Sequence, residues 1–206
     1  MLDLPPPDPS LEITIASQGM SKGLRQTEGV QIVGRGELAL GHLYVGLLAK
    51  NVTSPVTDAE AQAYVGYRAR AAGFELNLSA GYHRQLGAAP AADGERFEFQ
   101  ASAARPLGPV TARLGATFSP DDFGATGRSL YVEGGASVTV FTGASLSANL
   151  GVREREGGPD YTAFNAGIGY AVTRWLNAEL RYYDTARSGL GEIYEPRLVG
   201  SVRLRF

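Results

Sequence analysis

Apolar and polar residues alternate with a period of two along almost the whole chain from Leu11 onwards. In residues 73–84, for example, one parity carries Phe74, Leu76, Leu78, Ala80 and Tyr82. Successive side chains of a β-strand point to opposite faces, whereas an amphipathic helix repeats about every 3.6 residues. The chain is therefore predicted to be all-β, with strands that each have one apolar face.

About twelve strands of this kind are expected. They cover residues 11–24, 29–41, 42–52, 58–71, 73–85, 95–105, 108–119, 128–141, 143–154, 160–172, 174–185 and 196–206. Most contain the roughly 9–11 residues that a tilted strand needs to cross a bilayer. Tight turns are expected at Gly41–His42, Ala72–Gly73, Pro106–Leu107, Thr142–Gly143 and Thr173, and long polar loops at 53–57, 86–94, 120–127, 155–159 and 186–195. Short turns that alternate with long loops are typical of a closed antiparallel transmembrane β-barrel, an up-and-down meander.

The composition excludes several other classes of protein. No apolar run reaches about 18 residues, so a helical membrane span is not expected. Nineteen basic and 21 acidic residues give a net charge of −2 without a basic run, so no nucleic-acid partner is expected. With no cysteine and two histidines, we expect no enzyme activity, no metal site and no cofactor. The adjacent Asp121 and Asp122 lack the spaced oxygen ligands of a calcium loop, and a solvated turn after Pro120 is the preferred interpretation.

Alternation by itself also fits a soluble sandwich or a lipocalin-like barrel whose apolar face points inward. The aromatic residues favour a membrane barrel, because they gather towards the strand ends on either side of an aliphatic band. One expected girdle, near the short turns, contains Tyr67, Phe74, Phe141, Tyr170 and Phe206. The other, towards the long loops, contains Tyr82, Phe97, Phe99, Phe118, Phe164 and Tyr182. Outer-membrane lipid or detergent is therefore the expected surrounding of the apolar face.

The two ends of the chain have different patterns. Residues 1–10 contain a run of prolines, which predicts an extended periplasmic tail ahead of a barrel of residues 11–206. At the other end, Leu198, Val202 and Leu204 alternate with arginines, and the chain stops on Phe206. This pattern resembles the terminal strand that bacterial outer-membrane barrels present to their assembly machinery. We therefore expect that partner, an outer-membrane location, and both termini in the periplasm.

Residues 22–28 read Lys-Gly-Leu-Arg-Gln-Thr-Glu, and residues 118–124 read Phe-Ser-Pro-Asp-Asp-Phe-Gly. Together with residues 130–136, 160–162 and 180–185, they resemble motifs of the TorF family of porin-like proteins, a conserved proteobacterial family of unknown function. The chain departs from the motifs at Lys22 (usually arginine), Arg25 (serine) and Asp122 (an aromatic). The resemblance implies an outer-membrane barrel with pore activity, and it supplies no substrate and no catalytic residue.

If the apolar face meets lipid, the opposite parity lines the interior. The residues expected to line a pore are Arg35, Glu37, Lys50, Glu60, Arg68, Arg70, Glu75, Arg96, Glu98, Arg113, Glu133, Arg153, Glu179, Arg181 and Arg203. With Glu12, Arg197 and Arg205, which share this parity, seven acids face eleven bases, so the lining has a net charge of about +4. The alternative is that these residues form cross-strand ion pairs without any role in selectivity.

These features favour a porin-like channel for passive diffusion of ions or small polar solutes, with a weak anion preference. The alternative is a non-conducting structural or interaction barrel of the outer membrane. Inward tyrosines such as Tyr44, Tyr64 and Tyr131 are large enough to narrow the lumen. The strand of residues 58–71 has a mostly alanine outer face, which suggests a homo-oligomer contact, with a monomer as the alternative.

Overall fold

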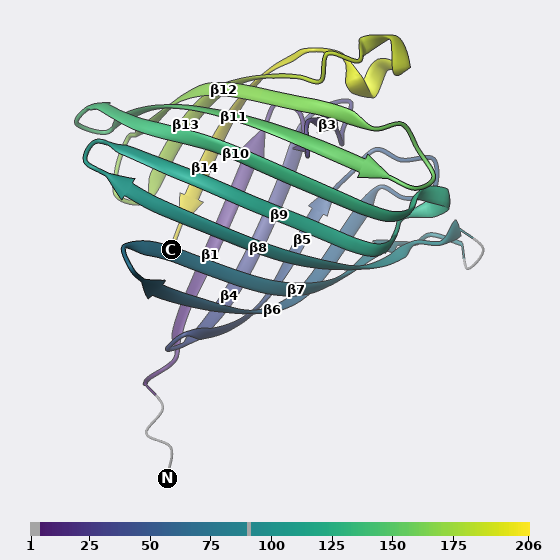
Figure 1. Cartoon of the computed structure of the whole chain (residues 1–206). Coiled ribbons are helices and arrows are strands. Elements are labelled where there is room, and N and C mark those ends of the chain that lie inside the picture. Colours follow the sequence, from purple (N-terminus) through teal and green to yellow (C-terminus); the bar gives the residue numbers. More distant parts are fainter. Residues whose placement is uncertain (1–4, 90–91) are drawn as a thin grey trace.

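Twelve strands form a closed barrel in the computed structural model, which describes residues 5–89 and 92–206 (Figure 1). The barrel strands are β1 (Asp8–Ala16), β4 (Gln31–Leu40), β5 (Leu43–Asn51), β6 (Ala59–Ala71), β7 (Phe74–Leu86), β8 (Glu95–Leu107), β9 (Val110–Asp122), β10 (Gly127–Phe141), β11 (Ala144–Arg155), β12 (Tyr161–Ala171), β13 (Leu176–Asp184) and β14 (Arg197–Arg205). Two further strands, β2 (Met20–Ser21) and β3 (Leu24–Arg25), form a separate hairpin. The predicted fold class, a closed antiparallel barrel of about twelve strands, is confirmed.

The barrel closes where the first strand meets the last. β1 pairs antiparallel with both β4 and β14, and Leu11 and Phe206 exchange backbone hydrogen bonds of 3.0 and 2.9 Å. Closure leaves no strand edge with unpaired backbone groups, which is what a spanning sheet requires in lipid. Three 3₁₀ turns, η2 (Gly124–Thr126), η3 (Ser188–Leu190) and η4 (Glu192–Tyr194), lie in the connections. Across residues 5–89 and 92–206, no helix has the length and apolar character needed to cross a membrane.

The connections divide the barrel into two ends. The short-turn end holds residues 41–42, 72–73, 108–109, 142–143 and 172–175, and the long-loop end holds residues 17–30, 52–58, 87–89, 92–94, 123–126, 156–160 and 185–196. At residues 72–73 both Ala72 (φ 51°) and Gly73 (φ 80°) have positive φ, as a two-residue hairpin turn requires. Both β1 and β14 have their outer ends at the short-turn end, so the two termini lie on the same side.

One predicted tight turn is displaced by two residues. β8 continues to Leu107, and the chain turns at Gly108–Pro109 instead of Pro106–Leu107. Gly108 has a φ of 66°, a conformation that glycine adopts without strain, and Pro109 has no N–H for a ladder. Pro106 is accommodated within β8, opposite Thr111.

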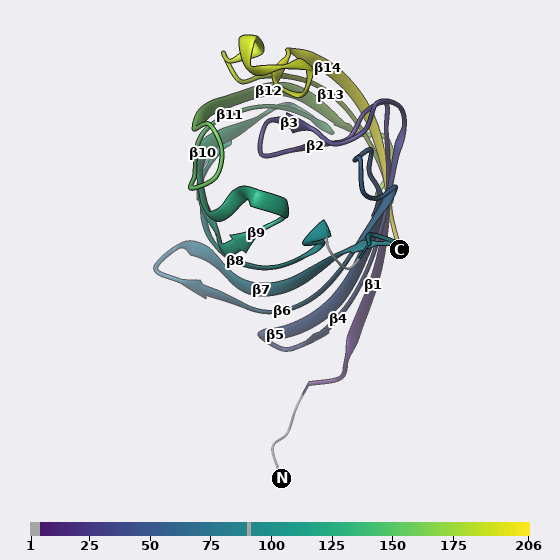
Figure 2. The same cartoon turned by 90° about the vertical axis from the view of Figure 1, so that its right-hand side faces the viewer.

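The predicted first strand, residues 11–24, is wrong at both ends. β1 begins at Asp8, inside the predicted tail of residues 1–10, of which residues 1–4 lie outside the described chain. It ends at Ala16, and residues 17–30 turn into the barrel, where β2 and β3 lie inside the ring of strands (Figure 2). The turn between β2 and β3 is made by Lys22 (φ 51°) and Gly23 (φ 84°). Thr27, which is 2% exposed, stabilises the base of this inward-turned segment. Its hydroxyl accepts a hydrogen bond from Gly19 N at 2.7 Å and donates one to the carbonyl of Gly29 at 2.6 Å.

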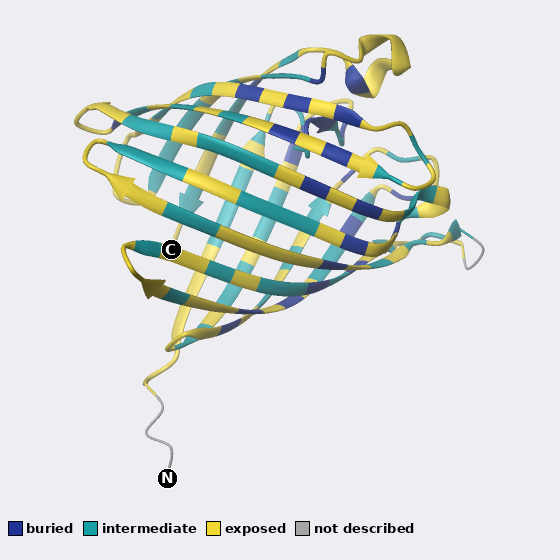
Figure 3. Ribbon diagram, viewed as in Figure 1, coloured by how far each residue is buried: buried dark blue, intermediate teal, exposed yellow. Residues whose placement is uncertain are grey.

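The outer face of the barrel is apolar and exposed. Leu47 on β5, Leu198 on β14 and Phe141 on β10 are 67%, 64% and 63% exposed. Buried residues gather instead towards the long-loop end of the strands (Figure 3). The buried part of the molecule is thus a ring of side chains inside the long-loop half of the barrel, instead of a central apolar core.

Candidate functional site

The inner face carries all fifteen charged residues that the sequence analysis selected. Strand register places them on one parity, for example Lys50 opposite Glu60 and Arg70 opposite Glu75. Lys22 and Asp122 also lie among them, although the sequence analysis placed Lys22 at the end of the strand of residues 11–24 and Asp122 in the loop of residues 120–127. Because one adds a positive and the other a negative charge, the net charge of about +4 is unchanged.

A buried group of charges, which we call the lumen cluster, occupies the long-loop half of the interior. Its members are Lys22, Lys50, Glu60, His83, Arg96, Glu98, Asp122 and Arg153, whose side chains are 4–15% exposed. Burial of isolated charges is strongly unfavourable, so such groups persist only where each has a partner. The members of the cluster therefore stabilise one another.

Direct contacts link the cluster into a network. Lys22 Nζ lies 2.5 Å from Glu98 Oε2, and Arg96 Nη1 lies 2.7 Å from Asp122 Oδ1. The second carboxylate oxygen of Asp122 pairs with Arg153. A second branch joins His83 Nδ1 to Glu60 Oε1 at 2.9 Å and Lys50 Nζ to Glu60 Oε2 at 3.3 Å. Four of the members are lysine or arginine and three are acidic, which leaves a slight positive excess.

The short-turn half of the lumen is open and wet by comparison. Arg70, Arg205 and Arg68 are 85%, 58% and 49% exposed there. Most of these arginines have acidic neighbours: Arg68 binds Glu37 at 2.6 and 3.0 Å, Arg70 binds Glu75 at 2.9 Å, and Arg205 binds Glu12 at 2.8 Å. Cross-strand ion pairs are thus abundant. Arg113 differs, since among the described residues its only polar side-chain contact is Ser137 Oγ at 3.4 Å.

Further predicted lumen residues lie between these two zones. Arg181 binds Glu179 and donates to Ser147 Oγ at 2.5 Å, which ties β13 to β11. Glu133 accepts a 2.8 Å hydrogen bond from the Tyr131 hydroxyl. Arg35 donates to the Tyr64 hydroxyl at 2.7 Å, and Arg203 lies 3.6 Å from Glu12.

The inward tyrosines lie flat along the wall. A side chain at Gly46, Gly66 or Gly151 would collide with the ring of Tyr64, Tyr44 or Tyr131, respectively. Aromatic rings that cover glycines on a neighbouring strand stabilise curved sheets. The guanidinium of Arg68 then stacks 3.9 Å from the centre of the Tyr44 ring. These rings therefore occupy wall positions and leave the centre of the lumen to the charged side chains.

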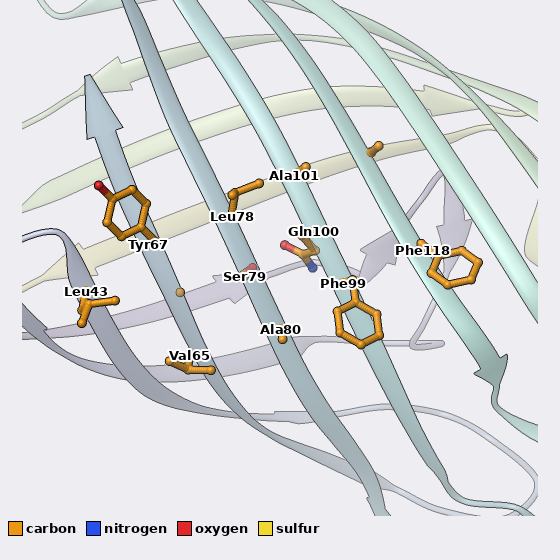
Figure 4. A pocket seen from close by; sticks show the side chains of 12 residues that line it. Leu43, Val65, Tyr67, Leu78, Ser79, Ala80, Phe99, Gln100, Ala101 and Phe118 are labelled. Atoms are coloured by element: carbon orange, nitrogen blue, oxygen red, sulfur yellow. The ribbon is translucent and has the colours of Figure 1, made fainter. Parts of the chain in front are cut away.

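In the described part of the chain, the outer face shows no comparable polar site. All eleven residues of the expected aromatic girdles point outward, with Phe74 and Tyr82 half-buried and the others exposed. Trp175, the single tryptophan, lies in the short turn of residues 172–175 and is 45% exposed; the sequence analysis did not include it in a girdle. A groove on this face has Ala80 and Ala101 in its floor and Leu78, Phe99 and Phe118 around it (Figure 4). Its apolar lining makes it a contact for lipid chains, outside the lumen.

Within residues 5–89 and 92–206, no group of three or more His, Asp or Glu side chains is arranged to hold an ion. Asp122 turns inward to Arg96 and Arg153, whereas Asp121 is exposed. The two adjacent carboxylates therefore do not form a common site. No local sequence signal places Asp122 inside, because its partners Arg96 on β8 and Arg153 on β11 come together only in the closed barrel.

Comparison with known proteins places this geometry in context. Residues 6–194 match the family described as "Bacterial protein of unknown function (Gcw_chp)". No curated protein matches the chain. Among solved structures, the KdgM porin is similar with a TM-score of 0.66 at 8% identity, over 96% of this chain and 99% of that one. The NanC porin gives a TM-score of 0.60 at 9% identity, over 95% and 97%. The COG4313 outer membrane channel from Pseudomonas putida gives 0.58 at 14% identity, over 96% and 94%.

Proposed function

The chain belongs to the Gcw_chp family of bacterial proteins, and from its closed barrel and charged interior we propose that it is an outer-membrane channel for passive diffusion. The observation that carries the proposal is the combination of an exposed apolar outer face with a lumen lined by charged side chains. An apolar surface of this extent is unfavourable in water and favourable in a bilayer. The solved barrels of similar fold include porins and an outer membrane channel, which supports the same function.

The solutes are ions or small polar molecules, with a weak preference for anions. The net lumen charge of about +4 attracts anions, and Arg113 supplies a charge that no acidic side chain within the described residues compensates. A KdgM porin has been solved in complex with disordered oligogalacturonate, an acidic sugar chain. Small acidic solutes are therefore the class to test first.

Planar-bilayer recording of the purified protein tests this proposal. With a salt gradient across the bilayer, we expect a reversal potential on the anion side, which shrinks at high salt because the Debye length falls from about 10 Å at 0.1 M to about 3 Å at 1 M. Arg113→Gln should reduce the preference. A reversal potential on the cation side at low salt would contradict the sign of the preference.

The lumen cluster favours a second candidate, a non-conducting barrel that serves as a structural or interaction platform. Its charged side chains are packed together at the long-loop end, which narrows the interior there. Absence of conductance in every variant, with the barrel folded, would favour this candidate.

We also place both termini in the periplasm, with the long loops outside the cell, as in outer-membrane barrels with short periplasmic turns. The terminal strand β14, which ends next to Phe206, is then the segment presented to the assembly machinery. An epitope tag within residues 186–195 should be accessible on intact cells, and a tag at the N-terminus should not. The reverse pattern would invert the proposed orientation.

A further inference from the structure

The hairpin of residues 19–26, here called the inner hairpin, is fixed to one side of the barrel interior. Leu24 is 5% exposed and packs with Tyr131, Tyr161, Ala163 and Tyr194. The Tyr161 hydroxyl donates to the carbonyl of Lys22 at 2.9 Å. Gly23 lies so close to Ala163 that any side chain at this position would collide with β12. The backbone of the inner hairpin is thus attached to the wall formed by β10 to β12.

From this wall, the side chain of Lys22 reaches a different part of the barrel. Its ammonium group binds Glu98 on β8, which is four strands away from β12 in the order of the sheet. Arg25 forms the hairpin's other ion pair, at 2.7 Å to Glu192 in η4, at the long-loop rim. Within the described residues, Lys22–Glu98 is therefore the ion pair that joins the inner hairpin to a barrel strand.

Glu98 has a second cationic neighbour, Arg96, and the imidazole ring of His83 also lies close to it. Arg96 Nη2 lies 3.6 Å from Glu98 Oε2, and His83 Nε2 lies 3.9 Å from Glu98 Oε1. This His83 nitrogen is buried and has no hydrogen-bond partner in the described structure. If Lys22 moves away, Glu98 therefore keeps positive charge around it, which lowers the penalty for breaking the pair. Breaking the Lys22–Glu98 pair would therefore leave Glu98 with Arg96 as a cationic partner.

We propose that the inner hairpin is the constriction of the channel, and that the Lys22–Glu98 pair sets both the width and the ion selectivity of the passage. This inference rests on the proposed function. With the pair formed, the Lys22 side chain spans the space between β12 and β8, and solutes must pass beside it. The motif of residues 22–28 thereby acquires a role inside the lumen.

Charge reversal at each partner tests the proposal in single-channel recordings. Lys22→Glu places two carboxylates together, so the side chain at position 22 should move away from Glu98. Conductance should then rise, and the reversal potential should shift towards cations. Glu98→Lys should also raise conductance but shift the reversal potential towards anions. The double variant K22E/E98K restores an ion pair and should return conductance towards the wild-type value.

The matched control is Arg84→Gln, which removes an exposed positive charge from the outward-facing parity of β7, outside the lumen. It should leave the single-channel conductance unchanged.

Each variant must first show a folded barrel by its resistance to unfolding in SDS at room temperature. If the wild type conducts and both single reversals leave conductance and selectivity unchanged, the constriction is refuted while the proposed function stands. If neither the wild type nor K22E conducts, the proposed function fails and the constriction fails with it. If only K22E conducts, the inner hairpin blocks the wild-type channel and the constriction is supported.

Thiol labelling tests the position of the inner hairpin independently of conductance. The natural chain has no cysteine, so Lys22→Cys and Arg70→Cys each introduce a single thiol. Lys22 is 11% exposed and Arg70 is 85% exposed, so a membrane-impermeant thiol reagent should modify the cysteine at position 22 more slowly. Equal rates would show that the inner hairpin does not occupy the lumen, and would overturn the inference.

Discussion

Leu24 holds the inner hairpin through apolar contacts, whereas Lys22 holds it through charge. Leu24 fits among three tyrosines and Ala163, and Lys22 lies between Glu98 and two arginines of the lumen cluster. Attachment of the inner hairpin and control of the passage thus depend on different residues, because Leu24 can be altered while Lys22 remains. Each therefore yields its own prediction.

Leu24→Ala should loosen the inner hairpin without unfolding the barrel. Removal of a buried leucine side chain costs about 2–5 kcal/mol, and here the loss falls on contacts between the hairpin and the wall. Trypsin should then cleave after Lys22 and Arg25 faster than in the wild type. Leu43→Ala is the control, because Leu43 lies on the outer face and is 55% exposed. Resistance of L24A to cleavage would show that other contacts hold the hairpin.

Selectivity should change with pH near the pKa of Lys22. Burial, together with Arg96 and Arg153, lowers the pKa of Lys22 from 10.5 to about 8, although Glu98 opposes this shift. Glu60, His83 and Asp122 complete the charged surroundings in the lumen cluster. Above pH 8 the side chain becomes neutral and its pairing with Glu98 weakens, so anion preference should fall between pH 7 and pH 9. Reversal potentials of K22Q should lack this step, and an equal step in K22Q would assign it to another group.

The same shift has a consequence for stability, with a definite sign. Because the pKa of Lys22 is lower in the folded chain, the unfolded chain binds more protons between about pH 8 and 10.5. The unfavourable contribution of the buried charge is therefore fully present below pH 8 and disappears as the pH rises towards 10.5. K22Q should remove this contribution, and with it the rise in stability across this pH range.

At the scale of elements, the strands and the inner hairpin obey different rules. A strand such as β5 keeps its period of two because one face meets an apolar environment and the other faces water in the lumen. The expected strand of residues 11–24 leaves the sheet after Ala16, and the inner hairpin then turns at Gly23, which has a φ of 84°. On the outer face, the position of a residue along its strand should govern how strongly a charged substitution at that residue destabilises the barrel.

Leu47→Arg should destabilise the barrel more than Leu43→Arg does. Leu47 is the middle residue of β5 and Leu43 its first residue at the short-turn end, and both are exposed on the outer face. Arginine on the lipid face costs about 2–4 kcal/mol at the midplane and about 0–1 kcal/mol near the interface. Urea unfolding from lipid vesicles measures the difference. Equal effects at the two positions would argue against a bilayer centred on β5.

For the molecule as a whole, the two halves of the lumen are unequal. The long-loop half holds the buried lumen cluster, and the short-turn half is open, with exposed arginines and glutamates. In the proposed orientation, the narrow part faces the outside of the cell and the wide part faces the periplasm. Solutes that enter from outside thus meet the constriction first.

The alanine-rich outer face of β6 yields a prediction about assembly. Ala59, Ala61, Ala63, Ala69 and Ala71 leave a flat strip, and small residues permit close packing between membrane elements. We expect a second copy of the barrel to pack there. Ala61→Leu together with Ala63→Leu should reduce the oligomer seen by native mass spectrometry, whereas Leu198→Ala on β14 should not. An oligomer that survives both leucines would exclude this strip as the contact, and a wild-type monomer would exclude the oligomer.

Much of the barrel was predictable because its signals are local. Parity in residues 59–71 or 110–118 fixes which side chains share a face, whatever the rest of the chain does. Strand number, the closing pair of β1 and β14 and the charge of the inner face follow from such runs. The turn at Gly108–Pro109 was misplaced because neighbouring prolines and glycines offer more than one turn within two residues. The functional roles of the lumen residues and of the aromatic girdles stay predictions.

The sequence by itself determined the strands, their faces and the excess of positive charge inside. Only the tertiary structure decided that residues 17–30 fold into the lumen, that the inward tyrosines lie along the wall, and that Asp122 joins Arg96 and Arg153. The physical reason is the range of the interactions involved. Alternation is set by each strand and its immediate surroundings, whereas Lys22 and Glu98 are 76 residues apart and meet only because the closed barrel places β8 within reach of the inner hairpin.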